Sequence, residues 1–531
     1  TSDTTTDPTA PESSLAVCSG NERFDKLHAL AVREAIQNSI HAVKHDAYNH
    51  GRPIAVEAFQ TGAKWHSVWT RDLAYACHLA LARFDPPRAG ASLLFKTSGL
   101  KTGVEDGYAN QIMQDTGSGG SYPVSTDRVV WALGAFEWLH YLDGGEREAM
   151  LRRIDPIIRG TVEQDRRLVF DPSDGLYRGE QSFLDWREQT YPPWTADSVL
   201  PIGTSKALGT NVAHFYILDR AAWLAETLGG DRDRDATRYR EWASSLKTAI
   251  RERLYDEETG LHGAYILDDG GMQTRVNRRD LLGESLAILL GVTDSAAAAR
   301  AIESYPAGPF GPPVVWPQER GVRIYHNCGI WPFVTAYWML AAKRVGNAAA
   351  VSRAIQSLMD GAARHESNME VLDFVSGKDR ATSHGIKGPA TTSPRQLWSV
   401  AGYLSMVHKV IFGLETAPDG IRFDPFIPAD LRASLFGARA TLSLRGLRYR
   451  NRTIEVAVRL PAAEDHRGVY RLARATLNGA PCPDGFVPAA ELADFNRWEL
   501  QLEHGPAASE RIHEVDTTDA RALFAPPPPR W

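Results

Sequence analysis

A repeated helical pattern extends over most of this chain. Between residues 24 and 413, apolar residues recur at three- and four-residue steps, which is the spacing of one face of an α-helix. Few strand patterns interrupt these segments, so we expect a mainly α-helical domain. The segments with this spacing are 24–45, 71–84, 126–142, 146–168, 206–228, 238–254, 279–290, 296–305, 329–345, 348–363 and 393–412. The connections 114–123 and 191–203 are long and rich in Gly, Pro, Trp and Asp, so we expect functional residues in such loops.

The pattern changes after Glu415. Apolar and polar residues then alternate in 421–428, 440–447, 453–460 and 469–477, with Gly, Pro and Asn between them, which predicts antiparallel strands in a C-terminal β-sandwich. At 531 residues the chain exceeds the size of a single compact core. We therefore divide it into a flexible N-terminal tether (1–20), a helical domain (21–414), a β-sandwich domain (415–515) and a Pro-rich tail (516–531) that we expect to be extended or disordered.

The composition excludes several classes of partner. The net charge is −6, from 65 acidic and 59 basic residues, so there is no electrostatic footprint for nucleic acid. The four cysteines lie far apart and lack metal-site spacing, and no cofactor or metal is expected. The 14 Trp and 17 Tyr are more informative, because rings with an apolar face and a polar tip suit carbohydrate, although most of them will be core residues.

The N-terminal composition bears on location. No apolar run approaches the roughly 20 residues that span a bilayer, so we expect a soluble protein without a membrane span. Residues 1–14 are rich in Thr, Ser, Asp and Pro and lack an initiator Met, as in the tether that remains after a signal segment is removed. We expect an exported protein, periplasmic or extracellular; an artificially trimmed chain would look the same.

Trp65, Trp69, Arg71 and Asp72 lie in the segment Lys64-Trp-His-Ser-Val-Trp-Thr-Arg-Asp72. At a helix start, Arg71 offers a fork of donors and Asp72 a pair of acceptors to neighbouring sugar hydroxyls. The two Trp rings would stack on the sugar. In the alternative interpretation, Asp72 caps the helix and Arg71 is its salt-bridge partner.

Two further segments each place a carboxylate among aromatic side chains. Asp185 lies in Phe183-Leu-Asp-Trp-Arg-Glu188, where Trp186 and burial could raise its pKa as an acid requires, provided that Arg187 points away. Glu188 is the competing carboxylate there, and a surface loop of alternating charge is the structural alternative. Far downstream, Glu370 lies in His365-Glu-Ser-Asn-Met-Glu-Val-Leu-Asp373.

The Glu370 segment has its own alternatives. Glu366 and Asp373 are possible substitutes for Glu370, and an acidic loop that caps a helix is the structural alternative. Two carboxyl groups roughly 6.5–9.5 Å apart would act as acid and base with inversion, whereas roughly 5–5.5 Å would mean a nucleophile and retention.

Together these motifs resemble the six-hairpin (α/α)6-barrel glycosidases, the clan of glucoamylases, trehalases and processing α-glucosidases. Trp69-Thr-Arg-Asp72 resembles the sugar-gripping entry of glucoamylases and debranching glucosidases. Asp185 matches the catalytic acid of trehalases and processing α-glucosidases, and Glu370 matches the base of the latter. The chain lacks the Trp-Glu-Glu acid segment of glucoamylase and the Gly-rich trehalase signature, which leaves the subfamily and the anomer open.

The resemblance also implies pocket residues further along the chain. Tyr325-His-Asn-Cys-Gly-Ile-Trp-Pro-Phe333 is similar to a helix start of that clan, which implies that His326, Asn327 and Trp331 line the pocket. Trp398 is a secondary candidate, since a Trp at a helix start is more often part of the core. We also assign Trp186, Arg187 and Glu188 to substrate binding. The expected fold is an (α/α)6 barrel with a C-terminal antiparallel β-sandwich.

The resemblance implies an exo-acting glycoside hydrolase that releases a terminal sugar, glucose in our reading, from an oligosaccharide by inversion. Asp185 would be the acid and Glu370 the base, with no cofactor. One alternative is a glycoside phosphorylase, in which His384, Lys387 and Thr391 would help to hold phosphate. The other is a carbohydrate-binding protein without catalysis.

Overall fold

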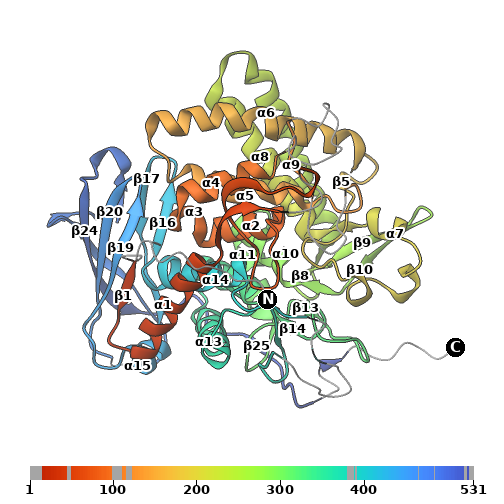
Figure 1. Ribbon diagram of the computed structural model, residues 1–531. Coiled ribbons are helices and arrows are strands. Elements are labelled where there is room, and N and C mark those ends of the chain that lie inside the picture. Colours follow the sequence, from red (N-terminus) through yellow and green to blue (C-terminus); the bar gives the residue numbers. More distant parts are fainter. Residues whose placement is uncertain are drawn as a thin grey trace.

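The computed structural model describes residues 15–44, 49–97, 110–114, 122–379, 388, 391–463, 466–483, 485–519 and 523–524. A large helical part is flanked by a sheet formed mostly from the C-terminal end of the chain (Figure 1). The two parts share one hydrophobic cluster. Tyr141 of the helical part, for example, meets Tyr449 of the sheet edge-on, with ring centroids 5.8 Å apart.

Six helices form a closed inner ring. Each packs against the next, and the last packs against the first. Every residue of the fifth and fourteenth helices is buried. A helix that is apolar all round has no solvent-facing side, so it must be covered by other helices. In ring order the six are α2 (Thr70–Ala76), α5 (Trp131–Leu139), α8 (Leu208–Leu228), α10 (Leu281–Leu289), α12 (Pro332–Val345) and α14 (Leu397–Ser405).

An outer layer of helices covers the ring. α1 packs on α14, α4 on α5, α6 and α9 on α8, and α11 and α13 on α12. This two-layered arrangement confirms the expected (α/α)6 barrel. The outer helices are α1 (Glu22–Gln37), α4 (Pro86–Phe95), α6 (Gly144–Leu168), α9 (Asp233–Leu254), α11 (Ser295–Ser304) and α13 (Ala348–His365). Two short helices, α3 (Ala82–Phe84) and α7 (Leu200–Gly203), lie outside this scheme.

The helix boundaries depart from the predicted ones at several helix ends. The predicted helix 24–45 ends at Gln37, and the chain continues as β2 (Ser39–Val43), which pairs with β3 (Ile54–Phe59). The predicted helix 206–228 begins with β6 (Lys206–Ala207). Helix α4 was not predicted. It opens with two prolines, and proline at the first helical positions sacrifices no hydrogen bond.

The C-terminal strands form two sheets. The larger has the order β1-β19-β20-β24-β21-β18, with β22 beside β21, and the smaller has the order β16-β17-β23. Phe423 of β17 lies against Trp498 of β24 with ring centroids 5.1 Å apart, which joins the sheets face to face. The strands are β1 (Ala16–Cys18), β16 (Leu414–Ala417), β17 (Gly420–Phe423), β18 (Phe426–Pro428), β19 (Thr441–Tyr449), β20 (Arg452–Arg459), β21 (Val469–Leu477), β22 (Ala480–Pro481), β23 (Phe486–Pro488) and β24 (Phe495–Gly505). All pairs within them are antiparallel except β20 with β24, which are parallel.

Both ends of the chain pack more closely than the sequence suggests. The predicted tether 1–20 is described from residue 15, and there β1 pairs with β19, because the edge of the large sheet offers unpaired backbone groups. At the other end, the chain leaves the sheet and β25 (His513–Glu514) pairs with β12 (Pro306–Ala307) of the helical part. Within the predicted tail, Leu523 and Phe524 are buried. At these described positions both ends are packed against the rest of the structure.

Short strand pairs brace the loops of the helical part. They are β4 (Phe170–Asp171) with β5 (Leu176–Tyr177), β7 (Tyr255–Asp256) with β8 (Leu261–His262), β9 (Tyr265–Asp269) with β10 (Met272–Val276) and with β6, β11 (Arg279–Asp280) with β13 (Val315–Trp316), and β14 (Gly329–Ile330) with β15 (Leu372–Asp373). None of the helices within the described ranges combines the length and the apolar character needed to cross a membrane.

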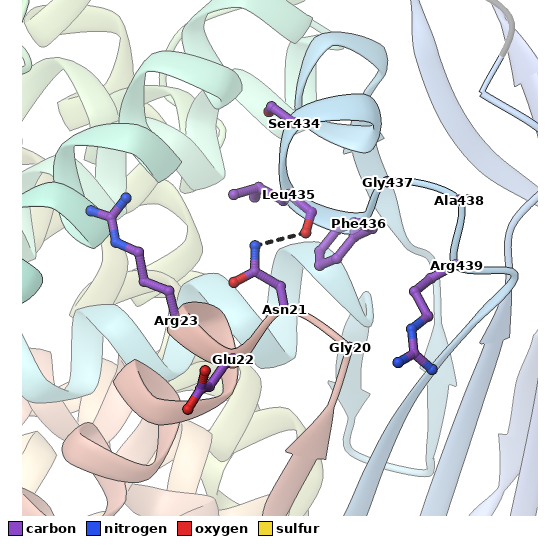
Figure 2. A pocket seen from close by; sticks show the side chains of 10 residues that line it. All are labelled: Gly20, Asn21, Glu22, Arg23, Ser434, Leu435, Phe436, Gly437, Ala438 and Arg439. Carbon is purple, nitrogen blue, oxygen red and sulfur yellow. Dashed lines mark hydrogen bonds between the residues drawn. The ribbon is translucent and has the colours of Figure 1, made fainter.

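A groove of about 710 Å³ marks one junction of the helical part with the sheet region. Figure 2 shows it between the start of α1 and the end of α15 (Ala429–Phe436). Asn21 caps α1 by accepting from Phe24 N, and its Nδ2 donates to Leu435 O over 2.7 Å. This one side chain therefore both starts the first helix and ties it to α15.

Candidate active site

A small cavity lies where three inner helices begin. Its volume is about 160 Å³. Trp69 is the N-cap of α2, Trp331 is the N-cap of α12, and Trp398 is the second residue of α14. The loop before α8 and the loop between α13 and α14 complete the wall. The lining residues are Trp65, Trp69, Arg71, Asp72, Phe183, Asp185, Tyr325, Trp331, Glu370 and Trp398.

Glu370 is held in place by three donors. Tyr325 OH and Trp65 Nε1 donate to Oε1 over 2.8 and 3.2 Å, and Ser393 N donates to Oε2 over 2.9 Å. The backbone of Glu370 also donates to Ser393 O over 2.9 Å. Burial raises the pKa of Glu370 to about 7, against the lowering effect of these three donors. The carboxyl group is thus fixed in direction and titrates near neutrality.

Asp185 faces the same cavity from the loop before α8. Arg71 Nη2 donates to its Oδ2 over 3.1 Å, and Arg71 Nη1 lies 3.4 Å from Asp127 Oδ2. Burial alone would lower the pKa of Arg71, but the charges of Asp185 and Asp127 raise it, so the guanidinium stays charged. The loop turns at Phe183, whose φ of 58° is uncommon for a residue with a side chain. Arg71 therefore anchors Asp185 to the start of α2.

Asp72 presents an unused acceptor to the cavity. It is 2% exposed, and its Oδ2 has no hydrogen-bond partner in the described part of the chain. Burial raises the pKa of Asp72 to about 8; Arg71 opposes that rise, and the charges of Asp185 and Glu370 add to it. The alternative in which Asp72 caps the helix is wrong, because Trp69 occupies the N-cap position of α2.

Indole and phenyl rings form the walls. Trp65 and Trp69 are half-buried with ring centroids 5.6 Å apart, while Trp331 and Trp398 are each 2% exposed with centroids 5.8 Å apart. Phe183 meets Trp331 edge-on at 5.3 Å. The first pair thus makes the more open side of the cavity and the second pair its closed side. Such surfaces suit the apolar faces of a sugar ring.

Four predicted substrate-binding residues do not line the cavity. Trp186 packs on Tyr325 with centroids 5.0 Å apart. Arg187 donates from Nε to Glu180 Oε2 over 2.6 Å. Glu188 is exposed. Asn327 is engaged with the backbone of Glu319, accepting from its N over 2.8 Å and donating to its O over 3.1 Å.

The competing carboxylates are also accounted for. Glu366 is exposed and ends α13 in a left-handed conformation. Asp373 accepts from Val375 N and Ser376 Oγ within a tight turn. Neither lines the cavity. His384 and Lys387, named for a phosphorylase, lie outside the described residues, and Thr391 is absent from the cavity wall.

Sequence reasoning missed two lining residues, Phe183 and Tyr325. Both stand at the edge of motifs that were recognised: Phe183 lies two residues before Asp185, and Tyr325 lies directly before His326. The signal that could have found them is their ring type beside a candidate carboxylate or indole. His326, also expected in the pocket, does not line the cavity but lies with Nε2 3.6 Å from Asp185 Oδ1. No cluster of metal-ligating side chains is found among the described residues.

Comparison with known proteins agrees with this geometry. Residues 208–399 match the family model "Mannosylglycerate hydrolase MGH1-like glycoside hydrolase domain". This stretch begins at α8 and includes Tyr325, Trp331, Glu370 and Trp398. An N,N'-diacetylchitobiose phosphorylase of Vibrio proteolyticus is 24% identical over 326 residues, which are 56% of this chain and 38% of that protein. The chain thus spans well under half the length of this curated relative.

Solved structures show the same fold. A GH63 mannosylglycerate hydrolase from Thermus thermophilus superposes with a TM-score of 0.51 and 16% identity over 72% of this chain and 100% of that one. A GH78 family rhamnosidase of Bacillus sp. GL1 gives a TM-score of 0.51 and 13% identity over 84% of this chain and 42% of that one. Residues 208–399 are therefore similar to a glycoside hydrolase domain, and the chain shares the fold of these solved structures.

Proposed function

We propose that this protein is an exo-acting glycoside hydrolase that releases a terminal sugar from an oligosaccharide. The proposed sugar is glucose, and the proposed reaction inverts the configuration at the anomeric carbon. One observation carries the proposal. Asp185 and Glu370, from loops far apart in the sequence, line a single cavity walled by Trp65, Trp331 and Trp398. Two carboxyl groups across a sugar-sized space are the minimum that acid–base cleavage of a glycosidic bond requires.

Glu370 fits the role of general base. Its three donors all favour the ionised form, because an ionised carboxylate only accepts hydrogen bonds. A base whose pKa is about 7 is poised to take a proton from water at neutral pH. The donors also keep the acceptor oxygens in fixed positions, so that an attacking water is always met in the same orientation.

Asp185 is proposed as the general acid. In the empty cavity its ion pair with Arg71 opposes protonation. A bound sugar would compete for the donors of Arg71 through its hydroxyl groups, and this competition weakens the pair. Asp185 then holds the proton that it passes to the leaving oxygen as the bond to the anomeric carbon breaks.

The size and polarity of the cavity favour one neutral terminal sugar. At about 160 Å³ it is smaller than the roughly 300–1,000 Å³ of sites for drug-sized ligands, so it suits one ring and not a run of several. Asp72 has an oxygen without a partner among the described residues, which is available to a hydroxyl group. The cavity is lined by the carboxyl groups of Asp72, Asp185 and Glu370 and by the single guanidinium of Arg71. This excess of acidic groups disfavours binding of an anionic sugar.

Electrostatics favour hydrolysis over phosphorolysis. A phosphate ion in place of the attacking water would lie beside the buried Glu370 carboxylate, which repels it. Arg71 is the sole cation among the lining residues that the structure describes, and it already faces Asp185 and Asp127. A phosphorylase would need further cations at this position. Release of sugar phosphate that depends on added phosphate would refute the hydrolase.

The amide variants Asp185→Asn and Glu370→Gln test the two roles. We expect each to lower turnover of an oligosaccharide by about 10³-fold or more with the fold unchanged, since each removes one reacting carboxyl group. Glu366→Gln is the matched control, because Glu366 is an exposed carboxylate in the same segment. Activity within tenfold of the parent in Asp185→Asn or Glu370→Gln would refute that residue's role.

Nitrophenyl glycosides of both anomers separate the acid from the base. A nitrophenolate leaves without a proton, so Asp185→Asn should recover most of its activity on these substrates and Glu370→Gln should not. The opposite pattern would reverse the two assignments. Proton NMR of the first-formed product gives the anomer, and retention would contradict the inverting mechanism. Stoichiometric sugar binding without turnover would instead indicate a carbohydrate-binding protein.

A further inference from the structure

His326 is a fully buried imidazole beside Asp185 that does not itself line the cavity. Its ring stacks on Trp331 with centroids 5.1 Å apart and an interplanar angle of 22°, and it meets Phe183 edge-on at 5.3 Å. Its backbone N donates to Gln189 Oε1 over 2.8 Å. The ring is therefore held from two sides by residues of the cavity wall, and its backbone is tied to the loop that carries Asp185.

The ring nitrogens of His326 have an unusual environment. Within the described ranges neither nitrogen has a hydrogen-bond partner, and Nε2 lies 3.6 Å from Asp185 Oδ1. The charged groups that act on the ring are Asp185, Arg71 and Glu188. Burial lowers the pKa of His326, so the imidazole is neutral at physiological pH and carries a proton on one nitrogen only.

An unpaired buried donor is costly, typically about 1–3 kcal/mol, so its persistence calls for an explanation. Catalytic hydrogen bonds are often long in an empty site and shorten when substrate binds. A shift of about half an ångström would bring Nε2 within hydrogen-bond range of Asp185 Oδ1. The opposite oxygen, Oδ2, already accepts from Arg71.

We propose that His326 is a positioning residue for the general acid, with its single ring proton on Nε2 and directed at Asp185 Oδ1. The proposal rests on the proposed function. When Asp185 gives its proton to the glycosidic oxygen and the bond to the anomeric carbon breaks, a carboxylate remains. Arg71 then donates to one of its oxygens and His326 to the other. His326 keeps its own proton throughout and stabilises the charge that develops on Asp185.

Two variants place an amide N–H at different ends of the former ring. His326→Gln puts a donor near the position of Nε2, His326→Asn puts one near Nδ1, and His326→Phe has none. We expect His326→Phe and His326→Asn to lower kcat by about 10- to 100-fold on an oligosaccharide, the effect of losing one hydrogen bond to a charged group. On a nitrophenyl glycoside, whose leaving group needs no proton, the loss should be under about threefold.

The pH profile supplies a second readout. Without the Nε2 donor the carboxylate form of Asp185 is less favoured, so the basic limb of kcat/KM should move to higher pH in His326→Phe. In His326→Gln the basic limb should lie at the same pH as in the parent protein. His214→Phe is the matched control. His214 is a buried imidazole stacked on Tyr177, with centroids 4.2 Å apart, and is absent from the cavity wall. His214→Phe should lower the midpoint of thermal unfolding. It should not change the ratio of the activity on the oligosaccharide to the activity on the nitrophenyl glycoside.

Several results would overturn the inference. One is an equal loss of kcat on the oligosaccharide and on the nitrophenyl glycoside, and another is equal kcat values for His326→Gln and His326→Asn. A third is a basic limb that moves to lower pH in His326→Phe, because Asp185 would then be the donor to the ring. Asp185→Asn, assayed alongside, separates the two levels of argument. An inactive Asp185→Asn with a fully active His326→Phe rejects the role of His326 alone. A fully active Asp185→Asn rejects the proposed function and this inference together.

Discussion

Removing one hydroxyl group from the partner of Glu370 tests the electrostatics of the site. In Tyr325→Phe the 2.8 Å donor to Glu370 Oε1 is lost, while the ring that packs on Trp186 and Trp331 remains. The donor favours the ionised form of Glu370, so its removal should raise the pKa of this carboxyl group above its present value of about 7. A general base must be ionised to act, and the acid limb of kcat/KM should therefore move to higher pH.

The size of the shift follows from the hydrogen bond. One hydrogen bond to a charged group contributes about 1.5–3 kcal/mol, and one pKa unit corresponds to about 1.4 kcal/mol. The limb should thus move by about one to two pH units. On the acid side of the profile the activity should fall by about 10- to 100-fold. The loss should shrink as the pH rises, because Glu370 then becomes ionised in both proteins.

The assay is initial-rate kinetics of sugar release between pH 5 and 9. Tyr403→Phe is the matched control: Tyr403 is a fully buried tyrosine of α14 whose hydroxyl group has no hydrogen-bond partner among the described residues. The acid limb of kcat/KM should lie at the same pH in Tyr403→Phe as in the parent protein. An unchanged limb in Tyr325→Phe, or one that moves to lower pH, would refute the argument that Glu370 acts as the base and that Tyr325 tunes it.

Two further predictions concern stability. Burial, together with the nearby charge of Arg83, lowers the pKa of His28 from 6.5 to about 4. Because the unfolded chain then binds the proton more tightly, the free energy of unfolding should fall by about 2 kcal/mol from this group between pH 7 and pH 5. Urea unfolding at both pH values checks this, and His28→Leu should show a smaller pH dependence; an equal one would contradict it. A Cβ on Gly329 would lie 1.8 Å from Tyr325 O, so Gly329→Ala should cost about 1–3 kcal/mol of stability and reduce kcat/KM, because the turn carries Tyr325 and Trp331. Gly144→Ala, where a Cβ meets no atom within 4 Å, is its control, and equal melting temperatures for the two variants would refute the steric argument.

The position of the cavity explains how distant motifs cooperate. The inner helices α2, α12 and α14 all begin at the cavity, so their N-terminal residues meet there although they are far apart in sequence. The N-terminal end of a helix carries partial positive charge, which favours nearby carboxylates. Asp72, Asp185 and Glu370 gather at that end. The barrel thus brings the acidic groups together and partly offsets their mutual repulsion.

Local patterns in the sequence determined most of the helical elements and the main C-terminal strands, and they pointed to several residues that line the cavity. Periodicity is a property of neighbouring residues, so the inner and outer helices could be located without knowing what they pack against. The pairing of carboxylates with aromatic residues likewise identified Asp185 and Glu370 as partners, and the cavity unites them. Helix α4, which opens with two prolines, was not among the predicted helices.

Tertiary packing alone decided which side chains of each motif face the cavity. Arg187 and Glu188 follow Asp185 directly, yet one pairs with Glu180 and the other points to solvent. The partners of Glu370 come from three other segments, through Trp65, Tyr325 and Ser393. In a loop the direction of a side chain follows no sequence period, because it is set by contacts with segments that only the folded barrel brings near. For the same reason the pKa values of Asp72 and Glu370, which depend on burial, belong to the fold and not to the motif.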